Sequence, residues 1–319
     1  MTLLGHDESW REWRAAQAGA RMHHGWILAG RKGLGKASFA FAAAADLLAS
    51  DGAPRFEPHA HPDILVLDPL PDGEDEERKR AEGKPYKTRR NITVDQVRAV
   101  QRRLTTRPTL GAWRAVIVDA ADELEKGAAN ALLKSLEEPP AGTIFLLVAH
   151  RLGRLQATIR SRCRVLRFAE LDERDLAAVV DRAAPELSPE ARRAALAVAG
   201  GSPGAALDFA GRGLDGAFAL MGRIAQDGDA DFGLREALLG EIGPRPDRER
   251  QLAAIEAARM VVLSTLPDSD RARAARVIEA HAALSRLLAQ APTANFDPAT
   301  LMLEIGGLLA SVAADREAA

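Results

Sequence analysis

The sequence predicts an α/β domain with a mainly parallel sheet, followed by all-α segments. Three observations lead to this fold class. A glycine-rich phosphate-binding frame lies between an apolar run and a helical pattern near the start of the chain. Short apolar runs then alternate with helical patterns up to residue 168. Beyond that residue only helical patterns remain.

The first strand and helix are predicted around the phosphate-binding frame. The apolar run 25–29 reads as a buried strand, and the alanine-rich segment 36–48 as a helix. Residues 30–37 have the frame G-x-x-x-x-G-K-[ST], with alanine at the last position. Strand, loop and helix in this order are the context in which such a loop cradles phosphates with its backbone amides and lysine. We therefore expect a true P-loop fold.

Gly30, Gly33, Gly35 and Lys36 are the candidate ligand-binding residues of a degenerate loop that could still hold a phosphate or a nucleotide. Ala37, however, offers no hydroxyl oxygen to a magnesium ion.

A second change affects the predicted strand 115–118. Asp119 follows this strand, but Ala120 stands where a P-loop ATPase of this kind would hold its water-activating glutamate. Metal coordination and water activation have each lost a side chain, so we expect no hydrolysis.

The remaining elements of the α/β part follow in order. Strand 64–67 comes after His61-Pro62-Asp63, and Thr93 with Gln96 forms a capping box at the start of a helix. The elements expected after that helix are strand 115–118, helix 128–136 and strand 143–149, the last buried on both faces.

Residues 71–90 interrupt this order with an acidic stretch followed by a basic one. We interpret them as a solvated loop or hairpin. An arm that contacts DNA is the alternative.

The domain boundaries follow the change in pattern: an α/β domain at 1–168, a small helical domain at 169–210 and a longer helical domain at 211–319. Asp172 is expected to cap one helix, and Ser188 with Pro189 to open another. Long apolar patterns at 253–263, 272–287 and 298–313 predict helices in the last part.

Composition narrows the class of protein. A hydrophobic content of 47% and a charged content of 28% fit a globular chain, and the net charge of -2 gives no overall attraction to nucleic acid. No apolar run approaches the ~20 residues that span a bilayer, and the N-terminus lacks the order of a signal peptide, so we expect a cytoplasmic protein.

Metal binding is not expected. Cys163 is the only cysteine, so a thiolate zinc site cannot form within the chain. The pairs His23/His24 and His59/His61 lack partners at ligand spacing, and hydrogen bonds in turns or at strand edges explain them better.

Arg162 is the candidate catalytic residue, acting in trans. It lies in the arginine-rich segment 158–164, which follows the last predicted strand. Together with the segment 128–140 (AANALLKSLEEPP), the triplet 161–163 (SRC) resembles the bacterial clamp-loader AAA+ family. Within it the chain looks like the delta-prime subunits of DNA polymerase III. The similarity covers roughly residues 20–168, and more weakly the turn at 200–204.

The resemblance implies an AAA+ module, a helical lid and a helical collar that mediates oligomerisation. Arg162 would be an arginine finger that completes the ATP site of an adjacent motor subunit. The implied partners are motor subunits of the gamma/tau type and a delta-type subunit in a heteropentamer, with the sliding clamp and primed DNA reached through the complex. No cofactor would be required, and no membrane would be involved.

Several positions depart from the family pattern. Ala205 stands where the second sensor arginine is expected, and the first sensor falls on Ala149 or His150. The four-cysteine zinc module of many relatives is missing. An active AAA+ ATPase of the motor type, using Ser38 as metal ligand, is the alternative function, although Ser38 lies about 100° around the helix from position 37. A scaffold that supplies no arginine is a third interpretation.

Overall fold

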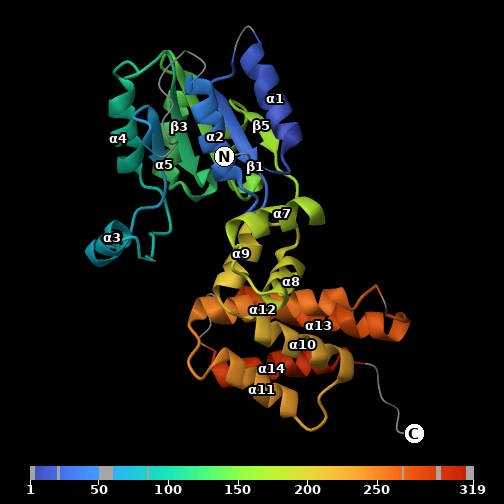
Figure 1. The fold of residues 1–319 in the computed structure, drawn as a ribbon. Coiled ribbons are helices and arrows are strands. Elements are labelled where there is room, and N and C mark those ends of the chain that lie inside the picture. Colours follow the sequence, from blue (N-terminus) through green and yellow to red (C-terminus); the bar gives the residue numbers. More distant parts are fainter. Residues whose placement is uncertain are drawn as a thin grey trace. The chain divides into compact units, whose positions relative to one another are not determined.

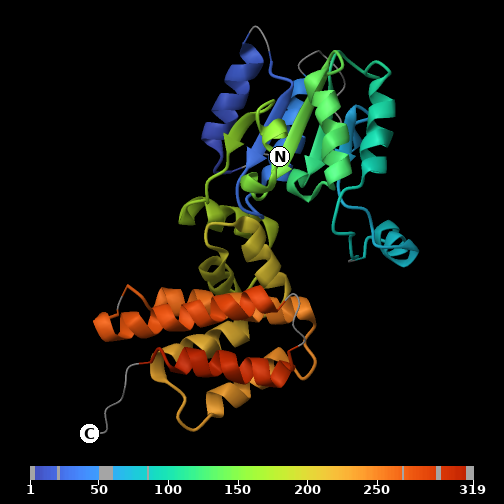
Figure 2. The same cartoon turned by 180° about the vertical axis from the view of Figure 1, so that it is seen from behind.

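The computed structural model describes residues 4–19, 22–49, 60–84, 86–267, 269–291 and 296–313. The chain forms two compact units, Met1–Leu171 and Asp172–Ala319, which are described separately (Figures 1 and 2). The expected division into three domains stays a prediction.

A five-stranded sheet in which every pairing is parallel forms the centre of the first unit, with strand order β2-β3-β4-β1-β5. The strands are β1 (Gly25–Ala29), β2 (Ile64–Leu67), β3 (Arg114–Asp119), β4 (Thr143–Ala149) and β5 (Arg164–Arg167). The four predicted strands are confirmed. β5 was not predicted, because this short edge strand begins and ends with exposed arginines and only Leu166 is buried.

Helices cover both faces of this sheet (Figures 1 and 2). On one face, α1 (Asp7–Ala18) and α2 (Lys36–Ala49) enclose a core that includes Trp13, Trp26 and Phe39. On the other face lie α4 (Val94–Leu104), α5 (Lys126–Glu137) and the short α6 (Ala157–Arg160). Two covered faces explain why every residue of β4 is buried and why its sequence is continuously apolar.

The predicted helix signals of this unit are confirmed. The Thr93 backbone N–H donates to Gln96 Oε1 (3.0 Å), which completes the capping box of α4. Val97 and Leu104 are buried on the sheet side of that helix. Two short 3-10 helices, η2 (Ala121–Glu123) and η3 (Leu152–Arg154), follow β3 and β4.

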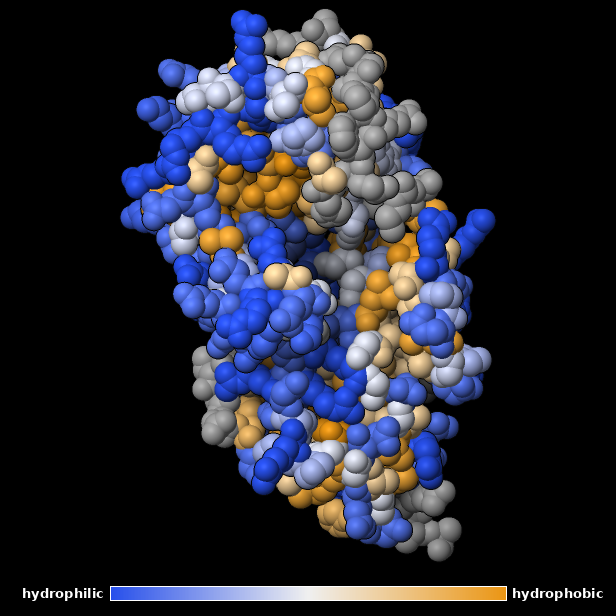
Figure 3. Space-filling view, turned by 60° about the vertical axis from the view of Figure 1, so that its left-hand side comes forward, coloured by the Kyte–Doolittle hydropathy of each residue, from blue (hydrophilic) through white to orange (hydrophobic). Residues whose placement is uncertain are grey.

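The segment between β2 and α4 forms a charged arm. An antiparallel bridge between Pro71 and Thr88 closes it, but the segment between these two residues contains a helix and is neither the expected open loop nor a simple hairpin. The arm carries α3 (Glu74–Ala81), which was not predicted because it has no apolar face and no buried residue. Its acidic first turn and basic last turn complement the helix dipole. Figure 3 faces the side from which α3 projects, and the surface there is largely hydrophilic.

The second unit is entirely helical in its described residues, as predicted. Its helices are α7 (Glu173–Ala183), α8 (Pro189–Ala199), α9 (Pro203–Gly211), α10 (Asp215–Asp227), α11 (Gly233–Ile242), α12 (Arg248–Ser264), α13 (Arg271–Gln290) and α14 (Pro298–Ala310). Asp172 and Ser188 cap α7 and α8 as expected. Across the described residues, none of the helices is both long and apolar enough to cross a membrane.

Candidate functional site

The carboxyl ends of three neighbouring strands bring the predicted loop and the acidic residues together. The loop follows β1, Asp119 ends β3, and His150 follows β4. Because β3, β4 and β1 are adjacent and parallel, their carboxyl ends meet at one edge of the sheet, where α/β proteins usually bind ligands. We call this edge the loop edge.

The glycines of the loop have different structural reasons. Gly33 and Gly35 have φ angles of 83° and 79°, a left-handed conformation that a residue with a Cβ adopts only under strain. Gly30 is required for packing instead, because a Cβ there would lie 2.6 Å from the carbonyl oxygen of Phe168. All three glycines therefore define the shape of the loop, whether or not it binds a phosphate.

Lys36, the first residue of α2, is almost fully buried. Its ammonium donates a hydrogen bond to the carbonyl oxygen of Arg31, within the loop itself. Burial lowers the pKa of Lys36 from 10.5 to about 8, although the nearby carboxylates of Asp119 and Asp122 act in the opposite direction. The lysine that would contact a phosphate is thus engaged with its own backbone.

The two aspartates of the acidic box differ in their surroundings. Burial raises the pKa of Asp119, and the charge of Lys36 only partly opposes this. Asp122 accepts hydrogen bonds from the backbone amides of His150 (2.8 Å) and Arg151 (3.1 Å) through its two oxygens. Asp122 therefore ties η2 to the end of β4, and Asp119 is the carboxylate of the box without such backbone donors.

His150 lies beside this cluster. Burial lowers its pKa, and the positive charge of Lys36 lowers it further. Its Nδ1 atom is buried and has no hydrogen-bond partner among the described residues. Ala149, the other candidate for the first sensor position, is fully buried in β4. The assignment of the sensor stays a prediction.

The residues present do not fit a magnesium nucleotide. Ala37 sits in the first turn of α2 without an oxygen, and Ala120 is buried before η2. Ser38 is exposed. Ala205 lies in α9 of the other unit. Asp119 alone of the usual magnesium-binding and water-activating side chains remains at the loop edge.

Arg162 lies at the opposite edge of the sheet, which we call the arginine edge. It is located between α6 and the start of β5. Its Nη1 donates to the carbonyl oxygen of Thr158 (2.9 Å) and to Ser161 Oγ (3.3 Å). Its Nη2 forms an ion pair with Glu137 Oε1 (2.7 Å) at the end of α5. The sequence contains Glu137 and Glu138 side by side, and nothing in it indicated which of them contacts the arginine.

The position of Arg162 excludes action on its own loop. β1 begins at the arginine edge and ends at the loop edge, and its five residues span roughly 13 Å at ~3.3 Å per residue. Arg162 and Cys163 also pack tightly on the start of β1. A Cβ on Gly25 would lie 2.9 Å from Cys163 Sγ and 3.3 Å from the carbonyl oxygen of Arg162. Arg162 and the phosphate-binding loop therefore lie at opposite ends of the strands.

The described histidines at the suspected metal positions make hydrogen bonds to backbone, as predicted. His23 Nδ1 contacts the Gly25 oxygen (2.8 Å), and His24 Nε2 contacts the Leu136 oxygen (2.9 Å). His61 Nδ1 accepts from the Asp63 N–H (3.1 Å). His59 lies outside the described residues. Within the described part of the chain, no three histidine, cysteine or acidic residues are grouped as metal ligands.

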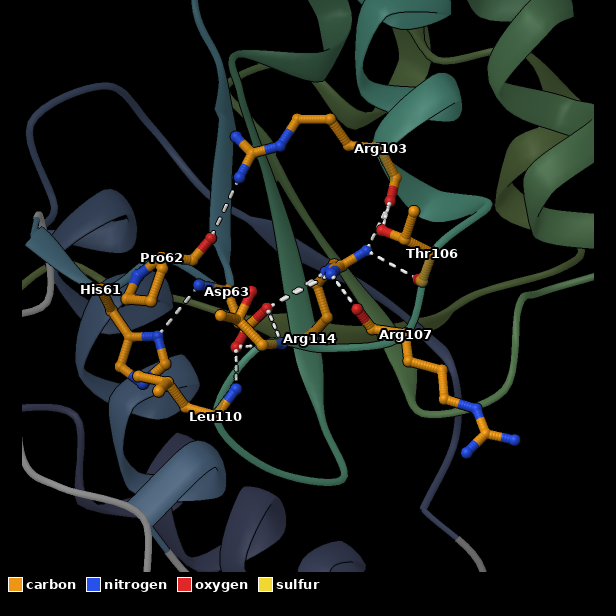
Figure 4. A network of polar contacts seen from close by, with 9 residues as sticks. His61, Pro62, Asp63, Arg103, Thr106, Arg107, Leu110 and Arg114 are labelled. Atoms are coloured by element: carbon orange, nitrogen blue, oxygen red, sulfur yellow. Dashed lines mark hydrogen bonds and ion pairs between the residues drawn. The ribbon is translucent and has the colours of Figure 1, made fainter.

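A buried ion pair that the sequence did not reveal also lies at the arginine edge of the sheet (Figure 4). Asp63, just before β2, accepts from the backbone amides of Thr109 and Leu110 and pairs with Arg114 (3.3 Å) at the start of β3. Burial alone would raise the pKa of Asp63, but these hydrogen bonds outweigh it and lower the pKa. The remaining donors of Arg114 reach the carbonyl oxygens of Arg103, Thr106 and Arg107. Every polar group of this pair has a partner, which indicates a structural role.

The strand order, the P-loop and the acidic end of β3 define a P-loop protein of the AAA+ class. Residues 5–172 match the family described as DNA polymerase III, delta subunit. The chain therefore belongs to this family.

Similar proteins agree with this assignment. The DNA polymerase III subunit delta' of Pseudomonas aeruginosa is 36% identical over 221 residues, which cover 64% of this chain and 62% of that protein. The Escherichia coli subunit delta' is 35% identical over 202 residues, 60% of this chain and 55% of its own length. The matches thus span about three fifths of these relatives. A DNA polymerase III gamma subunit-related protein of Thermotoga maritima has a similar fold, with a TM-score of 0.54, 16% identity and coverage of 95% and 99% of the two chains.

Proposed function

We propose that this chain is a non-hydrolysing delta-prime-type subunit of a DNA polymerase III clamp loader. The observation that carries the proposal is the arrangement of its two edges: a P-loop without the side chains for hydrolysis, and an arginine too far from that loop to act on it. The subunit would contribute to loading a sliding clamp onto primed DNA without hydrolysing ATP itself.

The loss of hydrolysis rests on three features of the loop edge. Ala37 cannot coordinate a metal ion, and Ala120 cannot activate water. Lys36 already donates to the carbonyl oxygen of Arg31, so a phosphate would have to compete with that bond. We propose that no cofactor and no zinc are required, and that the loop binds at most a phosphate or a nucleotide weakly.

The proposed positive role belongs to Arg162. A guanidinium placed across a subunit boundary stabilises the charge that develops on the transferred phosphoryl group. The partners would be a motor subunit of the gamma/tau type beside the arginine edge and a delta-type subunit, assembled as a heteropentamer. The protein would thus be an accessory subunit of the polymerase rather than an ATPase.

The test is the ATPase rate of a reconstituted loader, stimulated by clamp and primed DNA, with Arg162→Ala in this chain. The rate should fall clearly, although by less than the ~10³–10⁵ that a sole finger contributes, since other motor sites would take their arginine from motor neighbours. Arg164→Ala is the matched control, because Arg164 lies two residues further on, at the start of β5, and its guanidinium lies over the Trp26 ring, 5.0 Å from the centroid. Assembly is checked by size.

Two outcomes would contradict the proposal. Magnesium-dependent ATP turnover by the isolated chain, abolished by Lys36→Ala, would identify an active motor-type ATPase. Full activity and clamp loading in the Arg162→Ala complex would favour a scaffold subunit that supplies no arginine. In that case the ion pair of Arg162 with Glu137 would be purely structural.

A further inference from the structure

The Arg162 guanidinium has three contacts within the chain, and one of them comes from a side chain of another element, Glu137. We propose that Glu137 is a positioning residue for Arg162: its carboxylate fixes the guanidinium in the orientation in which it meets the neighbouring ATP site. This inference rests on the proposed function.

The contacts define how the guanidinium is oriented. Nη1 is directed to the Thr158 oxygen in α6 and to Ser161 Oγ, both within four residues of Arg162, whereas Nη2 meets Glu137, which belongs to α5. The two local contacts move together with Arg162. Glu137 is therefore the contact that anchors the guanidinium to α5, which packs against the sheet through Leu132 and Leu136.

The pair leaves part of the guanidinium available. Arginine has five N–H donors, and the three contacts made by Nη1 and Nη2 leave Nε without a contact among the described residues. The Arg162 side chain retains 35% of its exposure. The guanidinium is thus restrained on one side and accessible on the other. It can bind a phosphate oxygen with little further loss of side-chain conformational entropy.

Helix stability does not explain why an acidic residue occupies position 137. Glu137 is the last residue of α5, where the negative end of the helix dipole disfavours a carboxylate. Glu138 follows it and is exposed, and no side-chain contact of Glu138 occurs among the described residues. Among the described side-chain contacts, the ion pair with Arg162 distinguishes the two adjacent glutamates, and Glu138 provides the matched control.

The packing of the backbone at the arginine edge also limits where Arg162 can lie. Cys163 and the Arg162 carbonyl group lie against Gly25, so the backbone at these two residues cannot shift freely toward β1. With the backbone fixed, the remaining freedom of Arg162 lies in its side-chain torsions. Glu137 restrains those torsions through the 2.7 Å contact to Nη2.

The experiment is a double-mutant cycle in the reconstituted loader, with stimulated ATPase as the readout and assembly checked by size. Glu137→Ala should lower kcat roughly 3- to 10-fold and leave KM for ATP unchanged, because orientation matters most in the transition state. Glu137→Gln keeps an acceptor oxygen and should recover most of the rate. Glu138→Ala should behave as the unchanged protein. Glu137→Ala combined with Arg162→Ala should be no slower than Arg162→Ala alone.

The outcomes separate this inference from the proposed function. Full activity in Arg162→Ala overturns the proposed function and this inference with it. A slow Arg162→Ala complex together with full activity in Glu137→Ala overturns the inference alone. So does a further loss in the double variant, because Glu137 would then act independently of Arg162. A faster rate in Glu137→Ala would show that the carboxylate restrains Arg162 away from the ATP site, which also contradicts positioning.

Discussion

Lys36 places an ammonium group in a nearly closed part of the loop edge, where its charge is unfavourable. Its pKa of about 8 in the folded protein lies below its ordinary value of 10.5. A shift of this size corresponds to a penalty on the order of 3 kcal/mol while the lysine is charged. The bond to the Arg31 oxygen and the charge of Asp119 offset only part of the cost of burial.

Replacing Lys36 by methionine should therefore stabilise the protein at pH 7, by about 1–2 kcal/mol after the lost hydrogen bond is counted. The folded state binds fewer protons than the unfolded state between pH 8 and 10.5, so the free energy of unfolding of the unchanged protein rises through this window. The advantage of Lys36→Met should shrink over the same range. Urea unfolding followed by tryptophan fluorescence at several pH values measures this.

Lys32→Met is the control for that prediction, because Lys32 belongs to the same loop and is exposed. Its replacement should change the free energy of unfolding at pH 7 less than Lys36→Met does, because no buried ammonium group is removed. A Lys36→Met protein that is less stable at pH 7, or whose advantage is constant with pH, would show that the charge of Lys36 is not what costs stability.

At the scale of elements, the Asp63–Arg114 pair joins three parts of the sheet's arginine edge. It connects the start of β2, the start of β3 and the loop that follows α4. Both side chains are nearly fully buried. A buried pair of this kind contributes little compared with apolar packing, but removing one partner leaves the other charge without compensation.

Asp63→Ala should destabilise the first unit by about 3–5 kcal/mol, since Arg114 would remain buried and unpaired. Asp95→Ala, which removes an exposed pair with Arg98, should cost less than ~1 kcal/mol. The pKa of Asp63 is lowered in the folded state, so its contribution should be present above pH 3.8 and lost as the pH falls further. Denaturant unfolding of both variants checks the contrast, and equal losses would contradict the structural role.

Local signals explain which elements the sequence predicted. The capping box at Thr93, the glycines of the loop and the apolar run of β4 each act within a few residues, and the structure confirms them. The pairings of Arg162 with Glu137 and of Asp63 with Arg114 join positions 25 and 51 residues apart in the sequence, and many other arginines and acids were equally available. β5 and α3 were missed for a related reason, because neither shows a side-chain pattern of its own.

At the scale of the whole molecule, the chain consists of two units with separate sequence ranges, Met1–Leu171 and Asp172–Ala319. The four tryptophans, Trp10, Trp13, Trp26 and Trp113, all belong to the first unit. Helical content is present in both units, and the second unit contains only helices in its described part. Tryptophan fluorescence therefore reports on the first unit alone, whereas far-UV circular dichroism reports on both units.

Tryptophan fluorescence should show a single unfolding transition in urea, whereas far-UV circular dichroism should show two, because each unit is expected to unfold cooperatively on its own. Asp63→Ala should move the fluorescence transition and only the matching part of the dichroism curve. Coincident curves from both probes in the unchanged protein would mean that the units unfold together.

The sole thiol of the chain has a practical consequence for following the arginine edge. Burial raises the pKa of Cys163 to about 12, so at neutral pH little of this thiol is present as the reactive thiolate. Cys163 should therefore react slowly with maleimide reagents. A cysteine introduced at exposed Glu138 could be labelled selectively with a fluorophore, without first removing Cys163 from its contact with Gly25. Such a label would test in real time whether the proposed neighbouring subunit binds at this edge.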